Sequence, residues 1–600
     1  MVQNIDINSG PNGTTIAPKN GTFHGEYSMQ AETRRTLQDL LCRADSQIPE
    51  EAKAIVANAN FVTSNTGTPY FPCPFKETEA TSALKAVEGA LAAAIANLTL
   101  GEADRRVTVD LDRASAFLCS AYLSSVGGMG KAHPKVKSLL KDTDLLAAQS
   151  NLYRRLSANL YETKNPEEYF HIHGSLEATT TLNMIGLEGQ RPDMTDYHEC
   201  IKLIGSHVKQ FTAEELEEMN ASKMQAGVTA LEWSQFQETN HVLLPHLQSM
   251  GRLLTDTQGK TLLQEPPWRV EQTELTTPPA PFPAKSTPAP KPQILAGIRV
   301  LEMCRIIAGP AMGRGLAEYG ADVIKVTSPN LSDVPFFQVD GNLGKHTADL
   351  NLKNPEDRKA FEELLQSADV VLDGYRPGSL ERLGYGPKQL VELGQRRGRG
   401  FVYVAEDCFG HVGEWAHRPG WQQIADCVSG VAWAQGQFMG LNEPVVPPFP
   451  MSDYGTGCMG TIAALVGLFK RAKHGGSYHG TTSLCQYDIF LLQQGLYADS
   501  LLEELRRVHD PEFFGLRHYD SVDEVGKRAL NTMRLTHPEL FAETHLFESY
   551  SRGFDASVKF VRPVVEVDGT WNGFLRSSRP NGFDSPTWDG WEVDEGMLKL

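Results

Sequence analysis

The sequence predicts an α/β fold with a mainly parallel sheet in its second half. Beyond residue 293, short apolar runs typical of strands alternate with stretches of helical spacing, which is the pattern of repeated β-α-β units. The chain has 600 residues, of which 41% are apolar and 22% charged, a globular composition with length for several domains. In such sheets ligands bind at the carboxyl ends of the strands, so we expect the functional site there.

The expected elements follow one another in order. The first strand is an apolar run opened by Gly297, and the third alternates in character, whereas the others are short apolar runs. The helix that follows the third strand is amphipathic, and the last helix is long and apolar. We expect strands at 297–303, 321–326, 346–352, 369–372 and 401–404, and helices at 312–319, 355–367 and 458–471.

A proline-rich segment divides the chain. Residues 276–293 contain seven prolines, and each proline fixes φ and lacks an amide N–H, so neither a helix interior nor a central strand fits. The segment is typical of a semi-rigid extended linker. We therefore expect a first half at 1–275, the linker at 276–293, a sheet domain at 294–505, and a C-terminal extension at 506–600 that returns to the fold.

Charge and motifs exclude several function classes. The 56 basic and 74 acidic residues give a net charge of −18, which argues against broad binding to nucleic acid or to anionic membranes. The loop after the first strand is not G-x-G-x-x-G, and no G-x-x-x-x-G-K-[ST] loop is present, which disfavours NAD and P-loop nucleotides.

Cysteine usage and the absence of targeting signals predict the compartment. Nine scattered cysteines, no secretory signal in residues 1–10 and no run long enough for a spanning helix predict a reducing compartment. We expect a cytoplasmic protein, with a mitochondrial or peroxisomal location as the alternative.

Asp453 is the strongest candidate for chemistry. The prolines at 447–450 forbid a helix before Met451, and the apolar run after Gly457 requires one, so Asp453 lies at or near a helix N-terminus. The free N–H groups there would favour the ionised carboxylate and stabilise an oxyanion, and a carboxylate so placed can act as a nucleophile. The same placement also suits an ordinary N-cap aspartate.

An ordered set of motifs over residues 294–502 resembles the class III CoA-transferases. That family includes carnitine CoA-transferase, formyl-CoA transferase and α-methylacyl-CoA racemase. The resemblance implies a Rossmann-like, mainly parallel sheet of the class III CoA-transferase type. The matching motifs are residues 297–301, 308–310, 319–326, Asn342 with Gly344 and Lys345, 368–371, 375–378, 380–384, 409–410, 418–420 and 453–454.

The resemblance also implies an activity and a site. Asp453 maps onto the family's nucleophile, which forms an acyl anhydride and then an aspartyl-CoA thioester, so the implied function is an acyl-CoA:carboxylate CoA-transferase. Coenzyme A is then a co-substrate, the partners are an acyl-CoA donor and a small carboxylic acid acceptor, and no metal is required. The CoA-contacting positions fall on Gly374, Tyr375 and Arg382, with Arg418 as a second cation; the Tyr375 ring would stack on adenine and the Arg382 guanidinium would pair with phosphate.

Two alternatives stay open at this point. One is an acyl-CoA racemase, epimerase or isomerase on the same fold, but the histidine that such racemases carry after the Pro-Gly turn is replaced here by Trp421, which favours transfer. The other is a non-catalytic CoA-binding protein. His171 and His173 alternate on an expected strand and lack a third ligand, so we do not expect a metal site.

The first half resembles a degenerate copy of the later segment. Residues 70–77, an alanine-rich helix to Ala96 and a strand at 107–111 follow the same order as the run around Asp453. No aspartate follows the proline motif in this copy, so we expect a tandem half that has lost its nucleophile. Residues 151–255 are similar to the family's small domain, so this half is expected to supply a small α+β domain and to make either a homodimer or an intramolecular pseudo-dimer.

Overall fold

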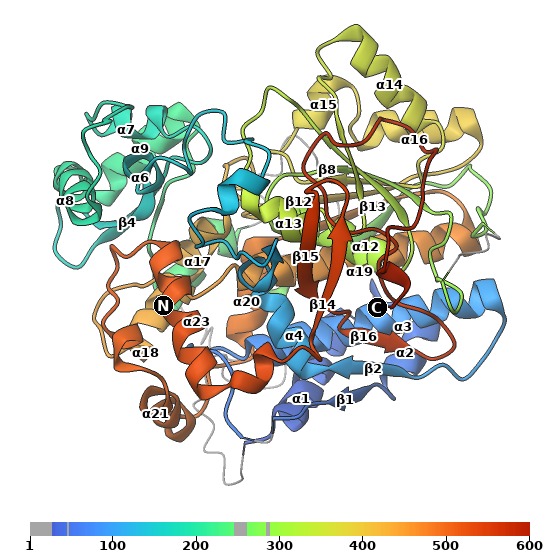
Figure 1. Cartoon of the computed structure of the whole chain (residues 1–600), viewed down its shortest axis with the longest axis horizontal. Helices are drawn as coiled ribbons and strands as arrows, with labels where there is room; N and C mark the ends of the chain where they lie inside the picture. Colours follow the sequence, from blue (N-terminus) through green and yellow to red (C-terminus); the bar gives the residue numbers. More distant parts are fainter. Residues whose placement is uncertain (1–26, 45–46, 66, 245–260, 284–288, 600) are drawn as a thin grey trace, which may run out of the picture.

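The computed structural model describes residues 27–44, 47–65, 67–244, 261–283 and 289–599. Its central element is a seven-stranded sheet in the order β10-β9-β8-β11-β12-β13-β7 (Figure 1). The strands from β8 to β13 are parallel and follow the doubly wound Rossmann order, while β7 is antiparallel to β13. The predicted fold class is confirmed. The strands are β7 (Arg269–Glu274), β8 (Arg299–Met303), β9 (Asp322–Thr327), β10 (His346–Asp349), β11 (Val370–Asp373), β12 (Val402–Asp407) and β13 (Ser477–Ser483).

Helices cover the sheet between these strands. Strands β9, β11 and β12 are buried along their whole length, as expected for parallel strands packed on both faces. The predicted fifth strand is longer than expected, because its pairing with β13 continues through Glu406 and Asp407 and so carries two carboxylates to the end of the sheet. The helices of this domain are α12 (Ala308–Glu318), α14 (Pro355–Leu365), α15 (Ser379–Leu383), α16 (Pro387–Arg397), α17 (Gln422–Ser429), α18 (Val431–Phe438), α19 (Met451–His474) and α20 (Leu484–Gln493).

Small residues let α12 and α19 pack closely. A Cβ atom built at Gly457 would lie 2.5 Å from the Cβ of Ala311, and one built at Gly460 would lie 2.1 Å from the Sδ of Met312. Only glycine permits this approach, which brings the N-termini of the two helices together. Helix α19 begins at Met451 rather than at residue 458, because tertiary packing outweighs the low helix propensity of the glycines in its first turns.

A small α+β lobe extends from the sheet domain (Figure 1, teal). It has its own hydrophobic core, which includes Tyr161, Phe170 and Ile204. This lobe agrees with the small domain predicted at 151–255, of which residues 245–255 lie outside the described part of the chain. Its elements are β4 (Ala158–Glu162), β5 (Tyr169–His173), β6 (Val228–Thr229), α6 (Leu152–Arg155), α7 (Thr179–Met184), α8 (Tyr197–Val208) and α9 (Ala213–Lys223).

Helix α3 (Glu77–Leu100) repeats the setting of α19. Both helices have 24 residues, and their N-cap residues, Lys76 and Pro450, have nearly equal dihedrals (φ −83° and ψ 54°, φ −84° and ψ 56°). Each helix leads into a strand and then a helix, β2 (Val107–Asp110) and α4 (Leu111–Leu118) in one case, β13 and α20 in the other. This likeness supports the predicted tandem organisation, which stays a prediction.

The residue of α3 that corresponds to Asp453 is Glu79, at the third helical position. Its carboxylate accepts hydrogen bonds from the hydroxyls of Tyr497, at 3.0 and 3.2 Å, and Tyr27, so it is enclosed by phenols. Helix α3 is long and apolar enough to cross a membrane, but most of its side chains are buried in the protein, as in the core helix of a globular domain.

Strand pairing crosses the predicted domain boundary. Strand β7 precedes the proline-rich segment yet belongs to the large sheet, while β16 (Val565–Val567), from the C-terminal extension, pairs with β2. The proline-rich segment itself contacts α19, since the Ala280 N–H donates to the Arg471 carbonyl at 3.2 Å. The domain limits therefore stay a prediction, and residues 284–288 of the linker lie outside the described residues.

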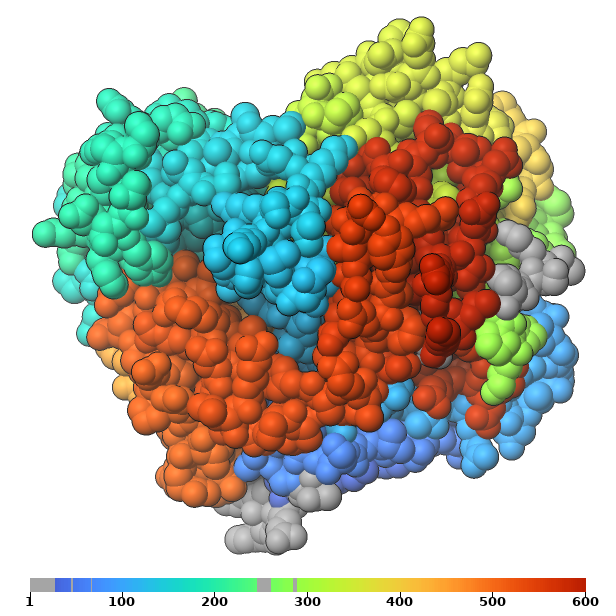
Figure 2. Space-filling model, viewed as in Figure 1, coloured from blue at the N-terminus to red at the C-terminus, as the bar shows by residue number. Residues whose placement is uncertain are grey.

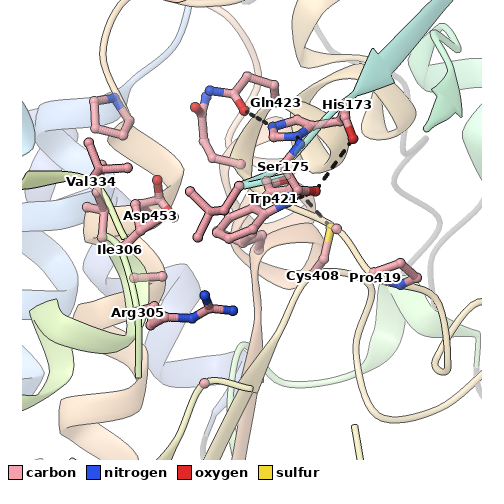
Figure 3. A pocket seen from close by; sticks show the side chains of 18 of the residues that line it. His173, Ser175, Arg305, Ile306, Val334, Cys408, Pro419, Trp421, Gln423 and Asp453 are labelled. Carbon is pink, nitrogen blue, oxygen red and sulfur yellow. Dashed lines mark hydrogen bonds between the residues drawn. The ribbon is translucent and has the colours of Figure 1, made fainter. Parts of the chain in front are cut away.

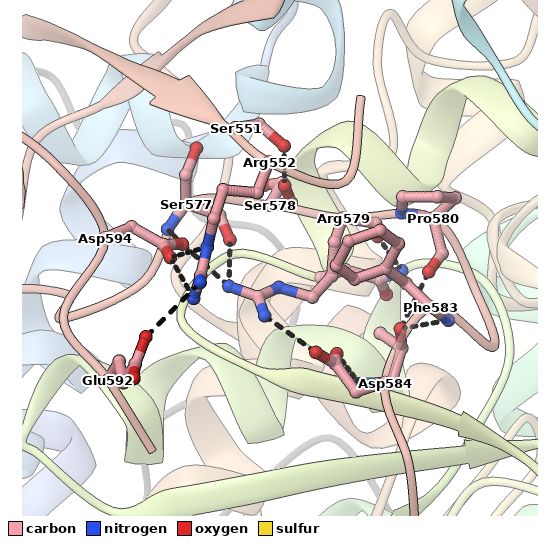
Figure 4. Close-up of polar contacts among 12 residues, drawn as sticks. Ser551, Arg552, Ser577, Ser578, Arg579, Pro580, Phe583, Asp584, Glu592 and Asp594 are labelled. Atoms are coloured by element: carbon pink, nitrogen blue, oxygen red, sulfur yellow. Dashed lines mark hydrogen bonds and ion pairs between the residues drawn. The ribbon is translucent and has the colours of Figure 1, made fainter. Parts of the chain in front are cut away.

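The C-terminal extension covers the edge of the large sheet at β10. The Asp584 N–H donates to the Thr347 carbonyl and the Asp584 carboxylate accepts from the Thr347 N–H, both at 2.8 Å. The buried guanidinium of Arg579 binds Asp584 at 2.9 Å and Asp594 at 2.7 Å (Figure 4). In Figure 2 this segment (red) lies on the surface between the helices of the sheet domain and those of the N-terminal half. The extension thus satisfies the free hydrogen-bonding groups of an edge strand.

Candidate active site

A cavity of about 500 Å³ opens at the carboxyl ends of β8, β11 and β12. Strands β8 and β11 mark the switch point of the sheet, where doubly wound proteins bind ligands, and the volume is within the range of ~300–1,000 Å³ typical of small-molecule sites. Residues from the small lobe and the C-terminal extension complete the walls. The contributing segments are 305–308, 374–379, 406–408, 418–423 and 447–453 from the sheet domain, 173–177 from the small lobe, and single residues such as Tyr122, Phe337, Leu484 and Val522.

Asp453 lies in this cavity, in the first turn of α19 (Figure 3). Burial raises the pKa of its carboxyl well above the usual range, the negative charge of Asp426 raises it further, and a hydrogen bond with the backbone of Ala308 lowers it. The backbone N–H group at the start of α12 favours the ionised form, but burial has the larger effect on the pKa. A helix terminus contributes about 0.3–1 kcal/mol, whereas burial shifts pKa values by up to ~3–5 units, so burial dominates.

The backbone on either side of Asp453 is strained. Ile306, in the loop after β8, has φ of 52°, and Phe449, just before α19, has φ of 64°. Left-handed backbone is rare for β-branched and bulky residues and costs about 1–3 kcal/mol at each position. Both residues line the cavity, and such strain is typical of functional sites whose geometry is imposed by the surrounding fold.

Several other carboxylates gather around Asp453. Burial raises the pKa of Asp426 to about 7 and that of Asp373 to about 6. Glu406 has a pKa raised well above its usual range, first by burial and then by the charges of Asp407 and Asp453. The described residues nevertheless contain no group of three or more side chains suited to a metal ion. Burial and mutual repulsion therefore favour the protonated forms of these carboxyl groups.

Two cations that were not among the predicted site residues lie at the same end of the sheet: Arg305, outside the motifs, and Arg376, within the motif at 375–378. Arg305 extends into the cavity (Figure 3), donates to the Ser332 carbonyl at 2.8 Å and lies 5.4 Å from the ring centroid of Tyr375. The pKa of Arg376 is lowered by loss of solvation and by the positive charge of Arg305. Within the described residues, neither guanidinium has a carboxylate at ion-pair distance, and Arg376 donates to the Met224 carbonyl at 3.3 Å, so both place positive charge near Tyr375.

The structure brings four of the five predicted site residues together in the cavity. Gly374, Tyr375, Arg418 and Asp453 all line the cavity. The Arg418 guanidinium is already bound to the Glu217 carboxylate at 2.6 Å, which limits its charge for a ligand. Arg382 is exposed on α15, donates to Ser379 at 3.1 Å, and is not among the described residues that line the cavity.

Trp421 lies across the cavity from Asp453 (Figure 3). Its indole N–H donates to the Ser175 hydroxyl at 2.9 Å, and its ring stacks on His173 with centroids 5.7 Å apart. His173 accepts from the Ser175 N–H at 3.0 Å and contacts Gln423 at 3.1 Å, and burial lowers its pKa to about 3. This imidazole is neutral with both nitrogens engaged, so it anchors the small lobe and is not a free base.

The comparisons with known proteins agree with this geometry. A sequence profile of CoA-transferase family III matches residues 295–522. The chain is 32% identical over 534 residues to the acetyl-coenzyme A transferase nodX of Hypoxylon pulicicidum (87% of this chain, 86% of the relative) and 31% identical over 563 residues to an acyl-CoA transferase of Gibberella moniliformis (90% and 92%). It is 30% identical over 193 residues to the succinyl-CoA:glutarate CoA-transferase of Homo sapiens (30% of this chain, 43% of the relative). The chain therefore belongs to CoA-transferase family III, and the predicted enzyme class, a CoA-transferase, is confirmed.

Proposed function

We propose that the protein transfers CoA from an acyl-CoA to a carboxylic acid through covalent intermediates on Asp453. The observation that carries this proposal is the placement of a single carboxylate at two converging helix N-termini, inside a cavity at the switch point of the sheet. A buried carboxylate of raised pKa is a stronger base and nucleophile once ionised than one in water.

The transfer proceeds in four steps that balance without a redox partner. An Asp453 oxygen attacks the thioester carbonyl and expels CoA thiolate, giving a mixed anhydride. The thiolate attacks the aspartyl carbonyl, which releases the donor carboxylate and leaves an aspartyl-CoA thioester. The acceptor carboxylate expels CoA thiolate from this thioester, and the thiolate then attacks the acceptor carbonyl of the second anhydride, which frees Asp453 and the new acyl-CoA.

Backbone and side-chain groups of the site support these steps. The first N–H groups of α12 have no intrahelical partner: that of Ala308 binds the Asp453 carboxylate, and that of Gly309 is a donor for an oxyanion that forms beside it. Burial raises the pKa of Glu406, and in its protonated form this carboxyl can donate a hydrogen bond. The left-handed backbone at Ile306 and Phe449 indicates that the surrounding fold imposes the geometry of the site before substrate arrives.

We further propose that CoA binds at the end of β11. Arg305 and Arg376 carry unbalanced positive charge next to the Tyr375 ring, which suits a phosphate-bearing ligand with an adenine base. Gly374 lets the backbone approach, since a Cβ there would lie 3.0 Å from the Cys304 Sγ. Arg382 is exposed on α15 and is not among the described cavity residues, so we expect it to contribute less to CoA binding.

The test is mass spectrometry of the full chain after incubation with acyl-CoAs and hydroxylamine. The expected result is a hydroxamate on the peptide that contains Asp453, absent in Asp453→Asn. Asp426→Asn is the matched control, because it removes a neighbouring carboxylate and leaves the nucleophile. Acyl transfer without any modification of the Asp453 peptide would refute the covalent route. Deuterium exchange at the α-carbon of the acyl-CoA, without transfer, would instead indicate an epimerase, and CoA binding with neither reaction would indicate a binding protein.

A further inference from the structure

Three aromatic rings from separate segments meet at one wall of the cavity. Tyr122 belongs to α5 (Ser120–Leu123), Phe337 ends the 3₁₀ helix Pro335–Phe337, and Phe449 precedes α19. The Tyr122 ring centroid lies 6.4 Å from that of Phe337 and 5.3 Å from that of Phe449, both typical of favourable aromatic contacts.

This aromatic wall adjoins Asp453. Phe449 is four residues before Asp453 in the chain, and Figure 3 places the side chains of Ile306 and Val334 next to the carboxylate. Ile306, Val334 and Phe337 line the cavity together and also border a second, water-sized cavity. An acyl group attacked by Asp453 therefore has apolar and aromatic side chains on this side.

Two cations behind the wall share one carboxylate. The Lys131 Nζ lies 4.9 Å from the Tyr122 ring centroid and 4.8 Å from that of Phe337, and it is paired with Asp523. Arg155, which lines the cavity, contacts the same carboxylate at 3.2 Å. Although burial opposes the shift, Lys131 and Arg155 together hold the pKa of Asp523 below its usual range, so this one carboxylate is shared by both cations and one positive charge is left unbalanced.

Buried carboxyl groups line another part of the cavity. Glu406, Asp407 and Asp453 face the cavity, and the burial and mutual repulsion that raise the pKa of Glu406 act in the same way on any further carboxylate. Arg305 and Arg376 lie at the Tyr375 end, where the proposed function places the anionic part of CoA.

We propose that Tyr122, Phe337 and Phe449 form the acyl subsite, and that the preferred donor carries an apolar or aromatic acyl group rather than a dicarboxylyl group. The assignment rests on the proposed function, because it requires that Asp453 react with the thioester. A distal carboxylate of the donor would lose its hydration against these apolar and aromatic side chains, whereas a hydrocarbon chain would lose only water contacts.

The test is isotope exchange between an acyl-CoA and its own labelled free acid, which needs no knowledge of the natural acceptor. The matched donors are valeryl-CoA and succinyl-CoA, whose acyl groups are similar in length and differ in the terminal carboxylate. We expect kcat/KM for valeryl exchange to exceed that for succinyl exchange by at least about tenfold. A factor of about ten is the lower end of what a one-methylene difference produces in an apolar pocket.

Variants of Phe337 make the assignment specific. Phe337→Ala is expected to lower valeryl exchange about tenfold with little change in succinyl exchange, and Phe337→Leu is expected to restore most of it. Phe583→Ala is the control, because Phe583 is 46% exposed and is not among the described cavity residues. CoA binding measured on each variant checks that the fold is intact.

The outcomes separate the two proposals. Exchange that is faster for succinyl-CoA, or equal for both donors, overturns the apolar acyl subsite and leaves the transferase mechanism standing. An equal loss of both exchanges in Phe337→Ala with unchanged CoA binding also overturns it. The absence of exchange with every donor overturns the proposed function, and the acyl subsite with it.

Discussion

Replacing Lys345 with methionine removes one partner of a fully buried ion pair beneath α12. The Lys345 Nζ lies 2.5 Å from the Glu302 Oε2 and 2.7 Å from the Pro310 carbonyl, and both side chains are completely buried. Burial raises the pKa of Glu302, while the charges of Lys345 and Lys325 lower it. Without Lys345, Glu302 must take up a proton in the folded state or stay charged with only the more distant Lys325 in support.

The free energy needed to protonate Glu302 sets the expected loss of folding stability. Protonating Glu302 at pH 7, from an ordinary pKa of 4.5, requires about 3.4 kcal/mol, and breaking buried pairs costs about 3–5 kcal/mol in general. A raised carboxyl pKa makes the folded state lose stability as pH rises above 4.5, so the same variant should lose only about 0.7 kcal/mol at pH 5.

The assay is the free energy of unfolding from urea titration at pH 5 and pH 7. Glu302→Gln with Lys345→Met should lie within about 1 kcal/mol of the natural chain, because no uncompensated charge remains. An equal loss at both pH values, or a double variant as unstable as Lys345→Met alone, would refute the reasoning.

Three further predictions concern charge at the site and at the sheet edge. Asp426→Asn should move the rising limb of the kcat/KM–pH profile to lower pH, because activity needs ionised Asp453 and the Asp426 charge raises its pKa; an unchanged profile would contradict this. Arg376→Gln should raise KM for acyl-CoA about tenfold or more with little effect on kcat, consistent with ~1.5–3 kcal/mol for a charged hydrogen bond, while Arg382→Gln should have a smaller effect in the same kinetic assay. Arg579→Met should destabilise the chain by about 3–5 kcal/mol in urea unfolding, because it leaves two carboxylates without their buried cation, and a loss below 1 kcal/mol would show that the extension contributes little.

The sheet domain was predictable because its signals are local. Buried parallel strands are continuous apolar runs, so β8, β9 and β11 were identified within one or two residues, and the proline cluster located the start of α19 near Asp453. The pairing of β7 was not predictable: its sequence, Arg-Val-Glu-Gln-Thr-Glu, is mostly polar, and its partner lies some two hundred residues away.

The site, too, could be predicted where the signal is local in sequence and could not be predicted where distant segments meet. Tyr375 and Asp453 belong to motifs that can be recognised in the sequence, and both line the cavity. Tyr122, Phe337 and Arg305 reach the cavity only because distant segments converge there, and their local sequence gives no sign of that convergence. Whether Arg418 keeps a free charge likewise depends on Glu217, a residue of the small lobe.

Transfer of oxygen-18 from a labelled acceptor acid to the enzyme tests the central claim most directly. When CoA thiolate attacks the acceptor carbonyl of the second anhydride, the bridging oxygen of the acceptor stays on the Asp453 carboxylate. After turnover with an acyl-CoA and the labelled acid, the Asp453 peptide should therefore gain heavy oxygen, and the same peptide from Asp453→Asn should not. Formation of the new acyl-CoA with no heavy oxygen in that peptide would contradict the covalent mechanism.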